Sequence, residues 1–252
     1  MRRPLIIGNW KMNGTRDSMS EVAAIAACAR LNRNVDVGLC LPFTLLHIPE
    51  AVRDVLWIGA QDCHALPSGP HTGCISAAML REARAQIVIV GHSERRQTHG
   101  ESDADVRAKC EAALSEQLTV ILCVGESRRQ RNAGGALSAV HDQLLGSVPP
   151  VRDPGGLVVA YEPVWAIGSG RAASAADIVE MHGSIRDMLI GQLGESGSQI
   201  RLLYGGSCNA QNCADILSLE NVEGALVGGA SLTAAEFNPI VRAAATVERA
   251  AA

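Results

Sequence analysis

Three ionisable residues follow or close short apolar runs that are rich in β-branched residues: Lys11, His92 and Glu162. Glu162 closes the apolar run Leu157–Ala160, so its carboxylate is expected at a dry rim, where it suits a general base. His92 stands where a helical turn is expected to begin, and the positive end of that turn disfavours the imidazolium form. It is therefore a candidate neutral hydrogen-bond donor, and an ordinary structural histidine is the alternative.

Lys11 is one of only two lysines among the 22 basic residues, the other being Lys109. A chain that otherwise uses arginine for positive charge keeps a compact ammonium group at this position. Such a group suits the neutralisation of an oxyanion or a phosphate. An ordinary surface lysine is the alternative interpretation.

Paired glycines follow two later apolar runs, within Tyr204–Ser207 and Leu226–Ser231. Glycine lets backbone N–H groups approach a ligand closely, which suits phosphate, although two tight turns would use the same residues. The apolar segment behind Glu162 is bounded by Pro163 and by Gly168 and Gly170, the composition of a hinged lid.

Four of the seven aromatic residues fall in the same strand-end segments: Trp10, Tyr161, Trp165 and Tyr204. We interpret this concentration as the shaping of one pocket. A lysine, a histidine, a glutamate and a phosphate cradle suit proton transfer next to the carbonyl of a small phosphorylated substrate. One carboxylate moves a proton between neighbouring carbons while the lysine and the neutral histidine stabilise the enediolate oxygens. The residues thus indicate an aldose–ketose isomerisation and leave the carbon count of the substrate open.

Eight apolar runs of strand length alternate with Ala-rich segments of helical period along the whole chain. The predicted strands are Leu5–Asn9, Val35–Leu41, Val55–Ala60, Gln86–Gly91, Thr119–Gly125, Leu157–Glu162, Gln199–Tyr204 and Val222–Gly228. The predicted helices begin near Asp17, Thr44, Ser76, Asp103, Ser127, Ser174, Asn209 and Thr233. Eight similar units without a linker predict that residues 1–252 form a single (β/α)8 barrel domain of the α/β class. Its strand-end loops then lie on one face.

The composition excludes several classes of protein. Hydrophobic residues make up 47% of the chain, so a large core is available, whereas no apolar run has the roughly 20 residues that a membrane span needs. The net charge of −4 without a basic stripe excludes a nucleic-acid partner. Met1-Arg2-Arg3 resembles the start of an export signal, but the apolar stretch after it is only Leu5–Ile7, so we expect a cytoplasmic protein whose eight cysteines stay reduced.

Two sequence features suggest a metal or a cofactor only weakly. Cys63, His64, His71 and Cys74 could bind zinc if they converged, yet they lack the usual spacing of zinc ligands. Residues 168–173 match G-x-G-x-x-A, but six residues separate the first glycine from the strand, which argues against a nicotinamide site. We therefore expect neither a metal nor a cofactor.

The strand-end segments together resemble the triosephosphate isomerase family. The matching segments are Gly8–Asn13, Gly91–Arg96, Ile121–Glu126, Ala160–Gly170, Tyr204–Ser207 and Leu226–Leu232. They span nearly the whole chain in the order expected for the family. The resemblance implies interconversion of dihydroxyacetone phosphate and D-glyceraldehyde 3-phosphate in glycolysis and gluconeogenesis.

The resemblance also implies a role for each matching residue. Glu162 would be the base, His92 the electrophile and Lys11 the electrostatic partner. Asn9 would contact substrate, and Glu94 and Cys123 would support the site. The phosphate would be bound by Asn9, Lys11, Gly168, Ser207, Gly228 and Gly229. The lid would be Pro163–Arg171, including Trp165, Ile167, Gly168 and Gly170, and would keep water from the enediolate.

The family is usually a homodimer in which the loop after the third strand, here residues 61–74, inserts beside the partner's active site. Thr72 would then lie near the partner's Asn9 and the partner's Glu94. Cys74 stands where the family commonly has Glu, so an ion pair to an arginine such as Arg95 would be lost. We still expect a dimer, with altered affinity or a thiol-sensitive interface. Ser169 and Arg171 stand where the lid commonly has Thr and Lys, and both changes keep the hydroxyl and the charge.

Three other functions are alternatives. An isomerase of the same fold that acts on a four-carbon sugar phosphate (a tetrulose phosphate) would keep the same residues. A Schiff-base aldolase would use Lys11, but needs that lysine desolvated or beside another cation. A phosphosugar-binding module without catalysis would not need Lys11, His92 and Glu162 together.

Overall fold

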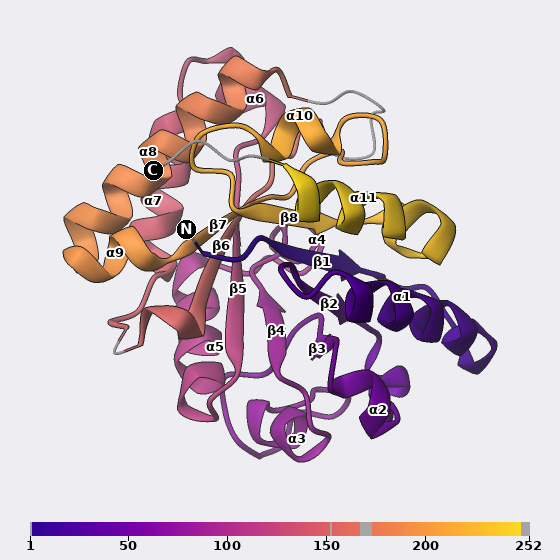
Figure 1. Ribbon diagram of the computed structural model, residues 1–252. Coiled ribbons are helices and arrows are strands. Elements are labelled where there is room, and N and C mark those ends of the chain that lie inside the picture. Colours follow the sequence, from indigo (N-terminus) through magenta and orange to yellow (C-terminus); the bar gives the residue numbers. More distant parts are fainter. Residues whose placement is uncertain (1, 152, 167–172, 248–252) are drawn as a thin grey trace.

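The computed structural model describes residues 2–151, 153–166 and 173–247, and its centre is a closed barrel of eight parallel strands (Figure 1). Each strand pairs with the next along the chain, and β8 closes the barrel by pairing with β1. The strands are β1 Leu5–Asn9, β2 Asp36–Cys40, β3 Trp57–Ala60, β4 Ile87–Val90, β5 Thr119–Val124, β6 Leu157–Tyr161, β7 Arg201–Tyr204 and β8 Gly224–Val227.

Helices surround the barrel and cover its outer face (Figure 1). The α-helices are α1 Met19–Leu31, α2 Glu50–Arg53, α3 Ala77–Glu82, α4 Ser93–Thr98, α5 Asp103–Ser115, α6 Arg128–Asn132, α7 Ala136–Ser147, α8 Ala175–Leu193, α9 Glu195–Gln199, α10 Cys213–Leu217 and α11 Ala234–Thr246. Short 3-10 turns lie at η1 Arg16–Ser18, η2 Phe43–Leu45, η3 Pro154–Gly156 and η4 Gly229–Ser231. No helix within the described ranges is long and apolar enough to cross a membrane.

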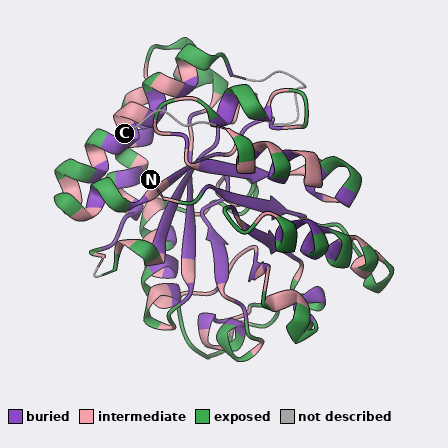
Figure 2. Ribbon diagram, viewed as in Figure 1, coloured by how far each residue is buried: buried purple, intermediate pink, exposed green. Residues whose placement is uncertain are grey.

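The strands are apolar along nearly their whole length because both of their faces are buried. Alternate residues point into the barrel, where Leu5, Ile7, Ile89 and Ile121 pack in one cluster. The intervening residues, such as Ile6, pack outward against the helices in a second, larger cluster. Figure 2 shows the result, with buried strands at the centre and exposed residues on the outer faces of the helices. Burying each such side chain contributes about 1.5–3 kcal/mol.

The predicted (β/α)8 barrel is confirmed, and β1 has the predicted bounds. The other seven strands are shorter than predicted by one or two residues at one or both ends, because the residues there lie outside the ladder of paired strands. Four predicted helix starts are caps whose side chains accept a backbone N–H bond: Ser76, Ser127, Ser174 and Thr233.

The predicted helix starts near Asp17, Thr44 and Asn209 were wrong in detail. Asp17 and Thr44 lie in 3-10 turns, and the α-helices that follow begin at Met19 and Glu50. Pro49 explains the second case, because the residue before a proline avoids the helical region. The segment from Asn209 becomes helical only at Cys213.

The predicted helices did not include α7 and α9, and α4 was expected only as a helical turn that begins at His92. The segment after Ser127, for which one helix is predicted, contains two, α6 and α7. Gly134 lies between them with φ +73°, a conformation that only glycine adopts without strain and that ends the first helix.

Candidate active site

A cavity of about 540 Å³ opens at the carboxyl ends of the strands and collects most of the predicted site residues. Its lining includes Asn9, Lys11, His92, Glu94, Glu162, Ser207, Gly228 and Gly229. They come from the ends of β1, β4, β6, β7 and β8, and they meet because all parallel strands of a barrel end on one face. The predicted residues Ile167, Gly168 and Gly170, with Ser169 and Arg171, lie outside the described residues, as does most of the 168–173 motif.

Glu162 is the most deeply buried carboxylate in the cavity, with an exposed fraction of 2%. Its Oε1 lies 2.9 Å from His92 Nε2, and its Oε2 accepts a hydrogen bond of 2.8 Å from the backbone N–H of Ser93. Burial alone would raise the pKa of Glu162, but His92, the Ser93 N–H and the charge of Lys11 together lower it below its ordinary value. Glu162 is therefore ionised at neutral pH and able to accept a proton.

His92 caps α4, since its Nδ1 accepts a 3.2 Å hydrogen bond from the backbone N–H of Glu94. An Nδ1 atom that accepts a hydrogen bond carries no proton, so the proton of the neutral ring is on Nε2 and points to Glu162. Burial opposes a charge on the ring, whereas the carboxylates of Glu162 and Glu94 favour it, and the pKa of His92 is raised. The hydrogen bonds fit a neutral ring with its proton on Nε2, whereas the raised pKa differs from the predicted disfavouring of the imidazolium form, because the two carboxylates favour the charge.

Lys11 follows β1 with φ +52°, a left-handed conformation that is strained for a residue other than glycine. Neighbouring groups fix it: its N–H donates to Asn9 Oδ1 at 3.0 Å, and its carbonyl accepts a 2.9 Å bond from Gln61 Nε2. Its Nζ lies 2.6 Å from Glu94 Oε1. The strained backbone therefore aims the ammonium group into the cavity.

Ser207, Gly228 and Gly229, which were predicted to bind phosphate, lie on the side of the cavity that follows β7 and β8, where a Cβ at Gly228 would lie 3.7 Å from Lys11 Cε. Gly228 caps the short 3-10 turn that Gly229 begins, and both glycines are at least partly exposed. The carbonyl of Ser207 accepts a 3.0 Å bond from Asn212, so the loop after β7 is fixed from behind. Cys208, Asn209, Leu226 and Ala230 also line this side and were not predicted.

The aromatic residues do not shape the cavity as predicted, because none of the four lines it. Trp10, Tyr161 and Tyr204 are buried, and they fix the segments that border the site instead. The Trp10 Nε1–H donates to the Ser231 carbonyl at 2.8 Å, and the Tyr204 hydroxyl accepts from the Ala173 N–H at 3.4 Å.

A fully buried carboxylate, Glu126, lies behind the beginning of the predicted lid. Its Oε1 accepts hydrogen bonds from the Trp165 Nε1–H at 2.7 Å, the Tyr161 hydroxyl at 3.1 Å and Arg131 at 2.9 Å. The guanidinium of Arg131 also lies 4.8 Å from the centre of the Trp165 ring. Trp165 is thereby fixed three residues after Glu162.

Sequence analysis missed three positioning groups: the backbone N–H of Ser93 and Gly205, which position the base, and Gln61, which holds the Lys11 carbonyl. Gly205 approaches Glu162 so closely that a Cβ there would lie 3.0 Å from Glu162 Cγ. Cys123, on β5, is fully buried, and its burial and the neighbouring charge of Glu162 raise its thiol pKa far above the usual range. It is therefore an uncharged neighbour of the base.

The residues considered for zinc do not form a metal site. Within the described ranges, no three His, Cys, Asp or Glu side chains are placed to hold one ion. The rings of His64 and His71 stack 4.0 Å apart, Cys63 is buried, and Cys74 is the exposed one of eight free cysteines.

Comparisons with known proteins agree with this arrangement. Residues 4–244 match the family model described as triosephosphate isomerase. The chain is 53% identical to the triosephosphate isomerase of Afipia carboxidovorans, over 96% of this chain and 97% of that protein. It is 52% identical to that of Ruegeria pomeroyi, over 96% and 98% of the two chains.

The fold also agrees with that of a solved structure. The crystal structure of the Bartonella henselae triosephosphate isomerase superposes with a TM-score of 0.88 at 43% identity, and the match covers 96% of this chain and 98% of that one. The chain therefore belongs to the triosephosphate isomerase family.

Proposed function

We propose that this protein interconverts dihydroxyacetone phosphate and D-glyceraldehyde 3-phosphate, with Glu162 as the base. The observation that carries the proposal is the pair formed by Glu162 and His92, 2.9 Å apart, in a cavity that Lys11 also lines. A buried, ionised carboxylate beside a neutral imidazole and an ammonium group suits the enolisation of a carbonyl. Membership of the family supports the three-carbon substrate.

In the proposed mechanism, Glu162 removes a proton from the carbon next to the substrate carbonyl. The negative charge moves to the carbonyl oxygen, where His92 Nε2–H and the Lys11 ammonium stabilise the enediolate. His92 Nε2 then donates its proton to the former carbonyl oxygen and takes the hydroxyl proton from the oxygen of the first carbon, where the new carbonyl forms. Glu162 returns its proton to the former carbonyl carbon, so the substrate is isomerised without net oxidation or reduction. Asn9, whose Oδ1 holds the Lys11 backbone, would contact the substrate, and Glu94 would release Lys11 Nζ when the substrate binds.

The phosphate would lie against Ser207, Gly228 and Gly229, where partly exposed backbone can donate N–H groups. Gly168 would complete this site, and Pro163–Arg171 would close over it and exclude water. Pro163 and Trp165 are the described members of that lid, and Trp165 is fixed by Glu126.

The test is the isomerisation of glyceraldehyde 3-phosphate and of a tetrulose phosphate by the natural protein and by Glu162→Gln. That substitution keeps the shape of the side chain and removes the base. We expect triose turnover to fall by about 10²–10⁴-fold in the variant. Preference for the four-carbon substrate would favour the rival isomerase, and a lack of turnover on both would favour a binding module. Trapping of Lys11 by borohydride with substrate would reveal an aldolase.

We also propose that the protein is a homodimer in which residues 61–74 insert beside the partner's site. Thr72, Gly73 and Cys74 are exposed at the tip of this loop, whose base is fixed by the pairing of His64 with Ser76. A groove of about 270 Å³ runs beside Lys11 and Glu94, and Met12 on its rim is 96% exposed. A second copy of the loop would cover this methionine.

Cys74 does not leave Arg95 without a carboxylate. The Arg95 guanidinium pairs within its own chain with Asp62 at 2.9 Å and with Glu101 at 2.6 Å. The proposed dimer therefore needs no acid at position 74. Sedimentation at micromolar concentration should show a dimer, and a monomer would contradict the proposal. Alkylation of the exposed Cys74 tests whether the interface is thiol-sensitive.

We further propose that residues 1–252 form one domain, since β1 and β8 close the same barrel. The protein would act in glycolysis and gluconeogenesis in the cytoplasm, where its eight free cysteines stay reduced.

A further inference from the structure

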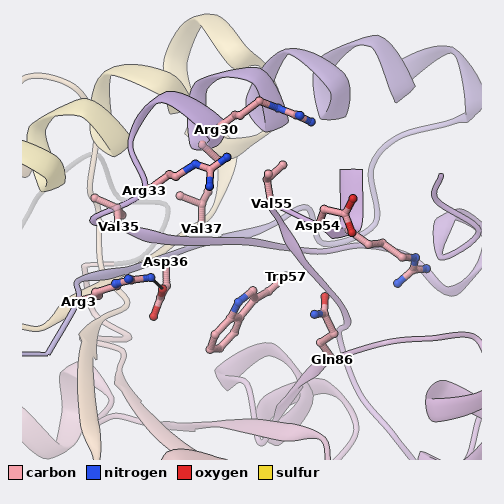
Figure 3. Close-up of a pocket in the computed structure, with 12 residues that line it drawn as sticks. Arg3, Arg30, Arg33, Val35, Asp36, Val37, Asp54, Val55, Trp57 and Gln86 are labelled. Carbon is pink, nitrogen blue, oxygen red and sulfur yellow. Dashed lines mark ion pairs between the residues drawn. The ribbon is translucent and has the colours of Figure 1, made fainter. Parts of the chain in front are cut away.

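A second large cavity, of about 610 Å³, lies at the amino ends of the strands, on the end of the barrel opposite the active site (Figure 3). Arg3, Asp36 and Trp57 border it at the starts of β1, β2 and β3, and Arg30 and Arg33 enter from the end of α1. Its volume is within the range of small-ligand sites. It shares no residue with the proposed catalytic cavity.

Four arginines line this cavity against two aspartates, although the whole chain has a net charge of −4. One of the aspartates, Asp36, is already neutralised, because Arg201 Nη1 lies 2.6 Å from its Oδ2. Arg3 approaches the same carboxylate only to 3.9 Å and is otherwise exposed. The cavity therefore carries a positive charge that the protein itself does not compensate.

Arg30, Arg33 and Arg53 form no ion pair with a carboxylate among the described residues, although Glu50 lies close enough to act on Arg53. Arg33 makes no hydrogen bond or ion pair in that part of the chain, and Arg30 donates one 3.1 Å bond to the Ala51 carbonyl. Arg53 is half-buried, and its guanidinium donates to main-chain carbonyls, including that of Ile48 at 3.2 Å. Arg53 thus supplies a fixed charge, whereas Arg30 and Arg33 keep N–H donors available for a ligand.

We propose that this cavity binds a compact polyanion with two or more phosphate groups, held by Arg30, Arg33 and Arg3. Guanidinium groups match phosphate oxygens in geometry and form charge-assisted bonds with them. A ligand with at least two negative charges is favoured because the cavity holds more than one uncompensated arginine. Such a ligand would lie at the amino ends of the strands, whereas Glu162 follows the carboxyl end of β6, and it would not contact the catalytic residues.

The test is to titrate the natural protein and the double variant Arg30→Ala/Arg33→Ala with inorganic pyrophosphate and to measure binding by calorimetry. Both arginines are exposed, so the fold should be kept. We expect binding at this cavity to weaken at least tenfold in the double variant, since hydrogen bonds to charged groups are lost. The matched control is Arg16→Ala/Arg81→Ala, which removes two exposed arginines elsewhere and the same net charge.

Two further measurements separate this cavity from the catalytic one, which also accepts phosphate. Trp57 lines the new cavity, so its fluorescence should respond to pyrophosphate, and the substitution Trp57→Phe should remove that response. Inhibition of isomerisation by pyrophosphate should be unchanged in the double variant. The proposal is overturned if the double variant binds like the natural protein, if the control pair loses the same affinity, or if pyrophosphate binds only in competition with substrate.

Discussion

The Nε2 atom of His92 lies 2.9 Å from Oε1 of Glu162, so the proposed base and the proposed electrophile share one hydrogen bond. Each group changes the titration of the other. The charge of Glu162 raises the pKa of His92 against the effect of burial, and His92 helps to lower the pKa of Glu162. The two groups therefore titrate as a pair.

This coupling predicts that Glu162→Gln lowers the pKa of His92. In the variant the ring is still buried and still close to Lys11, and both effects disfavour its charge, while the carboxylate of Glu162 is gone and only that of Glu94 still favours it. Titration of the His92 ring proton by NMR should show a pKa above 6.5 in the natural protein and a lower one in the variant. The His141 signal, from α7, serves as the internal reference. An unchanged His92 titration would show that the hydrogen bond does not couple the two groups.

The side chains of the site could be predicted from the sequence more completely than the contacts that position them. Lys11, His92 and Glu162 each end an apolar run, and the barrel places all such ends together. Gln61 and the N–H of Ser93 act through tertiary contacts that no local pattern encodes. The aromatic residues were misinterpreted because position in the sequence places a residue near the site without deciding whether its side chain points toward it.

The number and order of the strands could also be predicted from the sequence, but the residues at which each strand ends could not. Eight apolar runs fix the number of strands, but apolar residues such as Val35 and Leu41 extend beyond the ladder. A strand ends where its partner ends, which depends on a neighbour distant in sequence. The break at Gly134, by contrast, had a local signal in the Gly-Gly pair that separates α6 from α7.

Gly205→Ala should impair catalysis without unfolding the protein. The new Cβ would lie 3.0 Å from Glu162 Cγ and 3.0 Å from the Tyr161 carbonyl oxygen, so the base must move by a few tenths of an ångström. Because misplacement of a catalytic group by about 1 Å costs about 10²-fold, we expect kcat to fall by roughly tenfold or more. Steady-state kinetics would measure this change.

Gly191→Ala is the matched control for that substitution. Gly191 lies within α8, and a Cβ there would meet nothing within 4 Å. The same added methyl group should leave kcat unchanged and stabilise the helix by about 0.5–1 kcal/mol. Equal kinetic losses in the two variants would mean that the approach of Gly205 to Glu162 has no part in positioning the base.

Arg131→Met should destabilise the protein because it leaves Glu126 buried with only neutral donors. Arg131 bonds to Glu126 at 2.9 Å and also pairs with Asp177, and Glu126 is completely buried. Removal of one partner from a buried ion pair typically costs about 3–5 kcal/mol. Urea unfolding should show a loss of about 3 kcal/mol, since Arg131 itself is partly exposed.

Arg129→Met, on the same helix, provides the comparison. Arg129 is exposed and makes no ion pair within the described residues, so its loss should change stability by less than about 0.5 kcal/mol. If the two variants unfold at the same urea concentration, Glu126 does not depend on Arg131 for its charge compensation.

His182 should make the protein less stable in mild acid. Its ring is completely buried on α8, its Nδ1–H donates to the Asn221 carbonyl at 2.9 Å, and its Nε2 has no partner in the described part of the chain. Burial is the main reason that its pKa falls from 6.5 to about 4 in the folded protein. The unfolded chain therefore binds a proton on this ring at a higher pH than the folded protein does.

This difference in proton binding lowers the free energy of unfolding in acid. Above pH 6.5 the ring is neutral in both states, and between pH 6.5 and about 4 only the unfolded state is protonated, so the free energy of unfolding decreases as the pH falls. The full difference corresponds to roughly 3 kcal/mol. Urea unfolding from pH 7 to pH 4.5 should show a smaller decrease for His182→Gln, which retains a donor for the Asn221 carbonyl, than for the natural protein. His141→Gln, at a partly exposed ring, should keep the natural decrease, and equal slopes in all three proteins would assign the acid sensitivity to other groups.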